Sequence, residues 1–415
     1  MPRMRRFWVW LHRWVGLTMA GFLVIVGLTG TVLAFNFELE RFFAPQLFAH
    51  PADHPALPLG ELAERAASLV PHAHVEGVLY TDRDQAQVYY AADTDPRTGR
   101  EYVLGFDEFF IDPWTGKELG RRRAGDLTEG AINVMPFIYR LHWTLVAGDA
   151  GQWILGLVAL VWFLDAFNGL FLTLPVSPRH FASRWAKAWT IKRGAKGTRL
   201  NFDLHRANGL WFWPFVIVFA WSSVMMNIRP IYERGMRLVF DYVSYDDVYT
   251  QGTPNPHPRL DWRQAEAVGE ALLLTEASKR GVTISERHTL LYMPSVGAYI
   301  YEGRGSRDLF ERAPKGGGTA VLFDGDTGAL RHFEQPTGEH AGNTVESWLY
   351  ALHMARVFGT AYQVLVALFG GVTAILAVTG TLIWFRKHEV QRRRHAAAQE
   401  RKGGWRERPT SRLPL

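Results

Sequence analysis

The stretch LHRWVGL, residues 11–17, decides the fold because a histidine and an arginine stand at the start of a long apolar run. The same pattern returns 193 residues later as LHRANGL, residues 204–210, with His, Arg, Gly and Leu in register. A second relation, with an offset of 211 residues, joins YRLHWTLVAGDAG, which begins at Tyr139, to YALHMARVFGTAY, which begins at Tyr350. These offsets predict a duplicated chain in which the recurring histidines share a chemical task.

Four apolar segments are long enough, or nearly so, to cross a bilayer as a helix, which needs about 20 residues. They are residues 8–35, 153–174, 209–226 and 362–385. The first segment follows the basic MPRMRR start, but it is longer than the apolar part of a signal peptide, and no A-x-A cleavage site follows it. We therefore expect a membrane protein that keeps its first helix.

Lys and Arg predict the orientation, because they are retained on the cytoplasmic side of short loops. The N-terminus, the stretch after the second apolar segment and the RKHEVQRRR sequence after the fourth are all basic. We expect a multi-pass protein of the bacterial inner membrane with both termini cytoplasmic and the long connections, 36–133 and 227–347, in the periplasm. The net charge of +6 follows from these clusters, so the lipid bilayer is the expected partner and nucleic acid is not.

Cysteine is absent from the chain. This excludes disulfides in the external segments, thiolate-bound metals, iron–sulfur clusters and covalent C-x-x-C-H haem attachment. Any redox cofactor must therefore be held by histidine, methionine or oxygen ligands.

Both external segments show a helical pattern followed by short alternating stretches that predict strands. In the first, LGELAERAASLVP precedes EGVLYTD and AQVYYAA; in the second, DWRQAEAVGEALLLTEASKRG precedes HTLLYMP and GAYIYEG. Matching turns, 112–116 and 324–328, place Asp and Gly where side-chain hydrogen bonds and a positive φ are needed. The predicted fold class is a membrane core of four helices in two parallel repeats, with two small external α+β domains.

Four histidines recur at the ends of the predicted spans, as a cytoplasmic pair and an external pair. His12 and His205 form the first, and His142 and His353 form the second. A single histidine at a membrane boundary is adequately explained as an interfacial polar residue. Four of them in two symmetric pairs indicate a function, because an ionisable group inside a helix bundle is costly without a partner. Two histidines from facing helices can bind one haem iron axially.

Arginines accompany each pair. Arg13 and Arg206 directly follow the cytoplasmic histidines, and Arg140 and Arg356 flank the external ones. Guanidinium groups in these places could bind the haem propionates. The alternative is that they extend to the interface or follow the charge rule.

Glycines near the span ends give a weaker indication of the same kind. Gly30, Gly169 and Gly380 lie where a helix could admit a porphyrin face, although close helix packing explains glycines equally well. His142 precedes the apolar part of the second span by about ten residues, or about 15 Å of helix. We expect it near the external surface unless the helix continues through AGDAG.

These motifs resemble those of the PepSY-associated transmembrane proteins, a family that includes bacterial iron-regulated membrane proteins and inner-membrane ferric-siderophore reductases. The resemblance extends from LHRWVGLTMAGFLVIVGLTG to TGTLIWF, with the paired L-H-R and Y-x-L-H motifs and the D-P-W-T-G turn as its most specific features. It implies two b-type haems, PepSY-like external domains and electron transfer outward to a ferric siderophore. On this resemblance the axial ligands are His12, His142, His205 and His353.

The apolar spans and the repeat offsets, together with the resemblance, predict a division of the chain into eight segments. These are helix 1 (1–35), the first PepSY-like domain (36–133), helix 2 with its extension (134–174), a basic loop (175–203), helix 3 (204–226), the second PepSY-like domain (227–347), helix 4 with its extension (348–386) and a basic tail (387–415).

Several alternatives stay open. No glycine-rich nucleotide motif follows a predicted strand, so the electron donor is expected to be another molecule, a flavoprotein or a membrane quinol. His388, in WFRKHEV, is a rival cytoplasmic ligand, although the position 211 residues before it is Ser177. A non-enzymatic membrane module that binds or inhibits a periplasmic partner, with structural histidines, is the alternative function.

Aromatic residues next to the external histidines are the candidate substrate contacts. Tyr139, Trp348 and Tyr350 could offer ring faces to an oxygen-rich iron chelate between the two external domains. An interfacial aromatic belt is the alternative for each of them.

Overall fold

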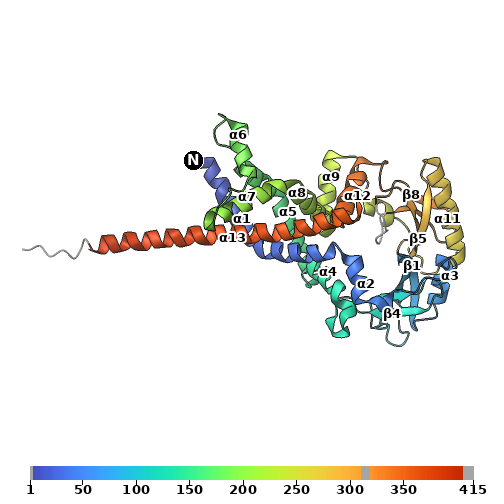
Figure 1. The fold of residues 1–415 in the computed structure, drawn as a ribbon. Helices are drawn as coiled ribbons and strands as arrows, with labels where there is room; N and C mark the ends of the chain where they lie inside the picture. The colour runs from blue at the N-terminus through green and yellow to red at the C-terminus, as the bar shows by residue number, and fades with distance from the viewer. Residues whose placement is uncertain (1–2, 310–317, 405–415) are drawn as a thin grey trace, which may run out of the picture. The chain divides into compact units, whose positions relative to one another are not determined.

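A computed structural model of the chain describes residues 3–309 and 318–404 (Figure 1). Part of the predicted basic tail, 405–415, lies outside the described residues. Two compact units are distinguished, and helices run from one into the other. The first unit comprises Met1–Leu28, Val158–Ala220 and Phe369–Leu415, and the second comprises Thr29–Leu157 and Trp221–Leu368.

Within the described residues, three helices are long and apolar enough to cross a membrane, and a bent pair makes a possible fourth span. The three helices are α1 (Arg3–Leu33), α5 (Gly148–Thr173) and α13 (Gly359–Gly404), the last qualifying over Gly359–Arg393. This agrees with the multi-pass membrane protein that the sequence predicts.

The third predicted span is the bent pair. Helices α7 (Gly197–Trp211) and α8 (Trp213–Asn227) meet at Phe212 with an angle of 68°. Pro214 follows the bend, and a proline lacks the N–H that would continue the hydrogen bonds of α7. The predicted span 209–226 therefore begins inside α7 and crosses the bend.

Short helices precede α5 and α13, and each is separated from the longer one by a break. Helix α4 (Val134–Thr144) ends at Leu145, which has φ 53°, and α12 (Ala341–His353) is followed by Ala355, also at φ 53°. A left-handed residue ends a helix because it turns the next N–H groups away from the helix axis. Helix α4, which carries His142, thus stops before the AGDAG sequence.

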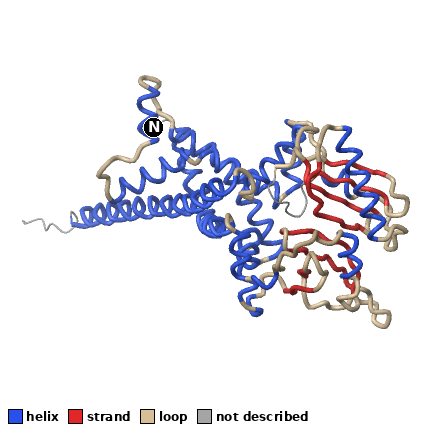
Figure 2. The backbone as a smooth tube through the Cα atoms, turned by 45° about the vertical axis from the view of Figure 1, so that its right-hand side comes forward, coloured by secondary structure: helices blue, strands red, loops and turns tan. Residues whose placement is uncertain are grey.

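The strands of the segments 36–133 and 227–347 form one antiparallel sheet of eight strands (Figure 2). Its order is β4-β3-β2-β1-β5-β6-β7-β8, so the two sets of four meet at β1 and β5. Their junction pairs Gly77 with Leu291, Val78 with Leu290 and Leu79 with Thr289. The strands are β1 (Ala73–Asp82), β2 (Gln85–Ala92), β3 (Glu108–Ile111), β4 (Glu118–Arg122), β5 (Ile284–Met293), β6 (Ala298–Gly305), β7 (Thr319–Asp324) and β8 (Leu330–Glu334).

Helices α3 (Leu59–Ala66) and α11 (Trp262–Lys279) cover one face of the sheet and contact each other (Figure 1). The backbone N–H groups of Leu59 and Gly60, at the start of α3, donate to the Glu266 carboxylate of α11. A carboxylate there satisfies N–H groups that have no partner within their helix. The predicted helix-then-strands order is confirmed in both segments.

The core under these helices consists of side chains that alternate along the strands. Tyr301 and Phe323 point to the helices, whereas Ile300 and Leu322 lie on the opposite face, in a cluster with Tyr249. This is the period of two that a strand imposes.

The other short helices are α2 (Asn36–Phe43), η1 (Pro45–Leu47), η2 (Leu127–Glu129), η3 (Ala131–Asn133), α6 (Phe181–Ala186), η4 (Lys187–Trp189), α9 (Arg229–Val239) and α10 (Tyr245–Tyr249).

The two predicted Asp–Gly turns have the geometry that the sequence indicates. The Asp112 carboxylate accepts hydrogen bonds from the backbone N–H groups of Trp114 and Thr115, and Gly116 has φ 68°. Asp324 does the same in its own turn, which Gly328 closes at φ 71°. Both aspartates therefore act as turn residues.

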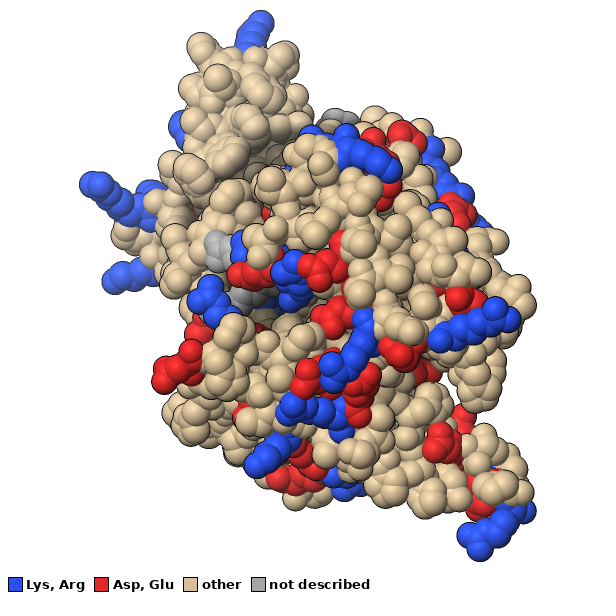
Figure 3. Space-filling view, turned by 90° about the vertical axis from the view of Figure 1, so that its right-hand side faces the viewer, with Lys and Arg blue, Asp and Glu red and all other residues tan. Residues whose placement is uncertain are grey.

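Charged side chains of both signs lie side by side on the face that Figure 3 shows. Ion pairs in the sheet region include Arg121 with Glu118 and Arg280 with Glu276. Exposed pairs of this kind contribute little stability, about 0–1 kcal/mol each. Their consequence is a surface on which positive and negative groups neutralise each other.

Candidate functional site

The first unit brings His12 of α1 and His205 of α7 together. Their ring centroids lie 6.2 Å apart, with the ring planes at 60°. These are the two histidines that the repeat of the L-H-R motif predicts as a pair. The two rings, 193 positions apart in the sequence, therefore meet within one unit.

The second unit brings His142 of α4 and His353 of α12 together in the same way. Their ring centroids lie 6.3 Å apart, with the planes at 70°. Desolvation and the neighbouring His142 lower the pKa of His353 to about 3, so its ring is neutral. A neutral imidazole is the form that donates a lone pair to a metal.

In the first pair, the Nδ1 atom of each histidine has a hydrogen-bond partner. His12 Nδ1 lies 2.7 Å from an Asp165 carboxylate oxygen of α5. His205 Nδ1 lies 3.0 Å from the Leu376 carbonyl oxygen and 3.2 Å from the Thr379 hydroxyl oxygen, both on α13. Metal-binding histidines almost always use one ring nitrogen for such a bond, which fixes the ring and leaves the other to the metal.

The second pair is held at Nδ1 by hydroxyl groups. His142 Nδ1 lies 2.9 Å from the Thr29 oxygen of α1, and His353 Nδ1 lies 2.7 Å from the Ser222 oxygen of α8. Each histidine thus has a partner on a different helix. In all four rings, Nδ1 is the nitrogen that forms the hydrogen bond. This leaves Nε2 for a metal, as expected for ligation through that atom.

The spacing of each pair fits a single metal ion between two rings. An imidazole nitrogen lies about 2 Å from a metal that it binds and about 1 Å from the centre of its ring, so two rings on one ion have centroids about 6 Å apart. The observed 6.2 Å and 6.3 Å agree with this value. The residues present therefore fit axial ligation of a haem iron at both places.

The three predicted glycines lie against the histidine rings. A Cβ atom added to Gly169 would lie 3.4 Å from Cε1 of His12, and one added to Gly380 would lie 3.1 Å from Cε1 of His205. For Gly30 the corresponding atom is Cε1 of His142, at 3.2 Å. The missing side chains thus leave room for the rings of the histidines themselves.

The arginines near His142 and His353 contact protein groups. Arg140 forms an ion pair with Asp107 at 3.1 Å, and the Arg356 guanidinium lies 3.4 Å from the ring centroid of Phe37. In the first unit Arg13 is exposed. Propionate binding by these arginines stays a prediction.

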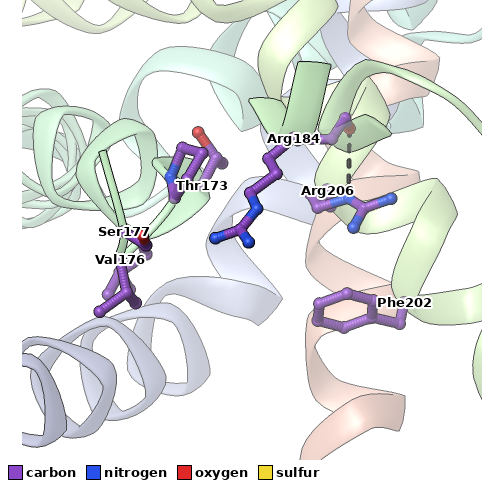
Figure 4. A pocket seen from close by; sticks show the side chains of 9 residues that line it. Thr173, Val176, Ser177, Arg184, Phe202 and Arg206 are labelled. Carbon is purple, nitrogen blue, oxygen red and sulfur yellow. Dashed lines mark hydrogen bonds between the residues drawn. The ribbon is translucent and has the colours of Figure 1, made fainter. Parts of the chain in front are cut away.

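Arg206 lies beside a cavity of about 370 Å³ in the first unit, and its Nε donates to the Ala188 carbonyl oxygen at 3.1 Å (Figure 4). Its guanidinium also pairs with Asp203 at 3.0 Å. Arg184 contributes a second guanidinium to the lining. The cavity is lined by Leu172, Thr173, Pro175, Val176, Ser177, Arg184, Ala188, Phe202 and Arg206.

The candidate substrate residues differ in exposure. Tyr139 is 47% exposed and Trp348 is 36% exposed, whereas Tyr350 is half-buried. Burial raises the pKa of Tyr350 to about 12, with a further increase from Tyr139 and an opposing effect of Arg356. Tyr139 and Trp348 are therefore the more exposed of the three, and the role of all three stays a prediction.

His388, the rival ligand, is exposed and stacks on Trp384, with centroids 5.3 Å apart and planes at 8°. Its stacking partner lies one turn earlier on the same helix, α13. The structure therefore gives His388 a local aromatic contact, while His12 has His205 opposite it.

The groups that hold the histidine rings were not identified from the sequence, but three of these residues carry a signal. Asp165 is the one acidic residue in the four predicted spans, and intramembrane acids are functional candidates. Thr29 and Ser222 are separated by the same 193 residues as the L-H-R motifs, so hydroxyl groups recur at equivalent places. Their histidine partners, however, lie more than 100 residues away along the chain.

Comparison with known proteins places these residues in a family. The family described as the PepSY-associated TM region matches residues 9–387. No curated protein matches the chain. The family match includes all four paired histidines and covers most of the 415 residues. The chain therefore belongs to the PepSY-associated transmembrane region family.

Proposed function

We propose that the protein is a di-haem b oxidoreductase of the bacterial inner membrane that passes electrons to a periplasmic ferric siderophore. One b-type haem is held between His12 and His205, and the other between His142 and His353. The observation that carries the proposal is the repeated geometry of the two pairs. In both pairs, the ring centroids lie about 6 Å apart, and the Nδ1 atom of each ring is hydrogen-bonded to a group on another helix.

The chain's own residues bind and orient the cofactor. The histidines supply two neutral nitrogens to each iron, and their Nδ1 partners hold the ring planes. Haem, when bound, supplies one-electron chemistry that no side chain in these spans offers. Ligands on two different helices hold each site without a covalent link, as the absence of cysteine requires.

The substrate is Fe(III) in an oxygen-rich chelate. One electron converts it to Fe(II), which is a poorer match for hard oxygen donors and is released from the chelator. In the proposed topology both termini are cytoplasmic, the molecule consists of two parallel repeats, and the PepSY-like domains lie in the periplasm. The reductant is a flavoprotein or a membrane quinol on the cytoplasmic or membrane side.

The absorbance spectrum of the purified chain tests the proposal. We expect a b-type spectrum on reduction and two haems per chain by pyridine haemochromogen assay. Rapid mixing of the reduced protein with a ferric siderophore should then oxidise both haems. A colourless protein would contradict the proposal and would leave a non-enzymatic binding module as the function.

A further inference from the structure

The two histidine pairs differ in the charge of the groups that hold them. At the second pair, both partners are neutral hydroxyls, those of Thr29 and Ser222. At the first pair, His205 is held by a neutral carbonyl and hydroxyl, but His12 is held by the carboxylate of Asp165 at 2.7 Å. Among these hydrogen-bond partners, the Asp165 carboxylate is the one that can carry a negative charge.

The carboxylate is held firmly in a membrane-spanning helix. Asp165 is 8% exposed, and its second oxygen accepts from Asn168 Nδ2 at 3.1 Å. The same Asn168 nitrogen lies 3.2 Å from the Trp8 carbonyl oxygen, which fixes the amide between α5 and α1. Within the described residues, no Lys or Arg side chain forms an ion pair with Asp165. Its charge is therefore directed at His12.

The sequence repeat shows that this acid is specific to one position. The offset of 211 residues relates Gly169 to Gly380, and both lie against a histidine ring. The same offset relates Asp165 to Leu376, whose carbonyl oxygen holds His205. The two helices therefore supply a hydrogen-bond acceptor at equivalent places, and only α5 supplies it with a charge.

An anionic acceptor changes the electronic character of an axial histidine. A carboxylate draws the Nδ1 proton away from the ring, which makes Nε2 a stronger donor, and outer-shell bonds of this kind tune the potential of the metal. The buried negative charge also favours the more positive ferric state, because little solvent screens it. Both effects stabilise Fe(III) relative to Fe(II).

We propose that Asp165 is a positioning residue that sets the reduction potential of the haem bound by His12 and His205 below that of the haem bound by His142 and His353. This rests on the proposed function. An electron delivered to the first pair then moves to the second pair in the thermodynamically favoured direction. One buried carboxylate thus sets the direction of electron transfer between the two pairs.

Optical redox titration of the full-length protein in detergent tests the proposal. We expect two reduction steps, and the His142→Ala protein, which has only the first-pair haem, should keep the step at lower potential. Asp165→Asn preserves the shape of the side chain and an acceptor oxygen for Nδ1 but removes the charge. It should move the lower step to higher potential and leave the upper step in place. Thr29→Ala, the matched control at the second pair, should leave the lower step unchanged.

A reciprocal variant adds the charge at the other pair. Thr29→Asp places a carboxylate beside His142 and should move the upper step to lower potential, which narrows the gap between the two steps. This variant and the order of the wild-type steps keep the test valid if Asp165→Asn does not bind haem.

Two results would overturn the inference: an upper step assigned to the first pair in the His142→Ala protein, or an Asp165→Asn titration identical to wild type. Either result, obtained with a protein that binds two haems and reduces ferric siderophore, would leave the proposed function standing. A protein without haem would instead remove the proposed function and the inference together.

Discussion

The imidazole rings of His142 and His353 face each other at 6.3 Å, although 211 residues separate them in the chain. Each ring lies near the end of a short helix that stops before an apolar helix begins, α4 before α5 and α12 before α13. The breaks at Leu145 and Ala355 allow the short helices to leave the direction of the long ones. Helices α4 and α12, which carry the two histidines, are therefore separate elements from α5 and α13, and both belong to the second unit.

The histidine pairing gives the first prediction. His12→Ala or His205→Ala should remove one of two haems, and His142→Ala or His353→Ala should remove the other, because each iron needs both of its rings. Haem content per chain and the number of steps in a redox titration measure this.

His388→Ala is the control for the pairing, since this ring stacks on Trp384 rather than on another histidine. It should retain both haems. If His388→Ala removed a haem while His12→Ala retained two, the assignment of the first pair would be wrong.

The glycine contacts give the second prediction. Gly380→Ala places a methyl group 3.1 Å from Cε1 of His205, which is closer than ordinary packing and pushes the ring from its place. Overpacking of this kind costs about 1–3 kcal/mol. We expect weaker haem binding at the first pair, seen as faster loss of haem to an acceptor protein.

Gly371→Ala is the matched control on the same helix, because nothing lies within 4 Å of its added methyl group. It should bind haem as the wild type does. Equal haem loss from both variants would show that Gly380 has no special role beside His205.

The sequence predicts much of this arrangement because the decisive signals are local or repeated. Apolar run length gives the spans, alternation gives the strands, and the offsets of 193 and 211 residues pair His12 with His205 and His142 with His353. Asp112 and Asp324 are correctly interpreted as turn residues, because the side-chain bonds of a turn form within a few residues.

Other features depend on contacts between distant segments. The pairing of β1 with β5 joins residues such as Val78 and Leu290, and no local pattern states which strand edges will meet. The bend at Phe212 has a local cause in Pro214, but a proline also fits the first turn of a helix, so the sequence alone does not give the angle. Asp165 is conspicuous as an acid in an apolar span, yet its partner His12 lies 153 residues away.

The electron donor gives the third prediction. The sequence has no glycine-rich nucleotide motif after a strand, so the purified chain should not oxidise NADPH at a rate above the buffer blank, whereas dithionite should reduce both haems. Absorbance at 340 nm and in the haem bands measures the two reactions. Rapid NADPH oxidation by homogeneous protein would show that the chain has its own nucleotide site.

A buried pair in the eight-stranded sheet gives the fourth prediction. Burial raises the pKa of Glu302 from 4.5 to about 7, and burial together with Arg304 lowers the pKa of His288 from 6.5 to about 4. Between pH 4.5 and 7 the folded chain holds a proton on Glu302 that the unfolded chain releases, so stability falls as pH rises. Between pH 4 and 6.5 the unfolded chain binds a proton on His288 that the folded chain lacks, so stability rises with pH.

The two effects oppose each other over the shared range, about pH 4.5–6.5. Glu302→Gln should leave only the effect of His288, so that the melting temperature rises from pH 4 to 6.5. His288→Gln should leave only the effect of Glu302, so that the melting temperature falls from pH 4.5 to 7. Differential scanning fluorimetry in detergent measures both. Glu286→Gln, which alters an exposed residue of the same strand, is the control and should follow the wild-type profile. Parallel profiles for all three variants would contradict the prediction.

The last prediction places the ferric chelate beside α4 and α12, close to His142 and His353. Tyr139 and Trp348 are exposed there, and aromatic faces with a neighbouring guanidinium suit a bulky, oxygen-rich chelate. His142→Ala, which lacks the second haem, should lose rapid electron transfer to ferric siderophore in stopped-flow experiments, even though the first haem is fully reduced at the start. Tyr139→Ala should raise the chelate concentration at which the rate is half-maximal while keeping both haems. Tyr102→Ala, whose ring stacks on His72, serves as the control. Oxidation of the His142→Ala protein at the wild-type rate would show that the chelate accepts its electron elsewhere.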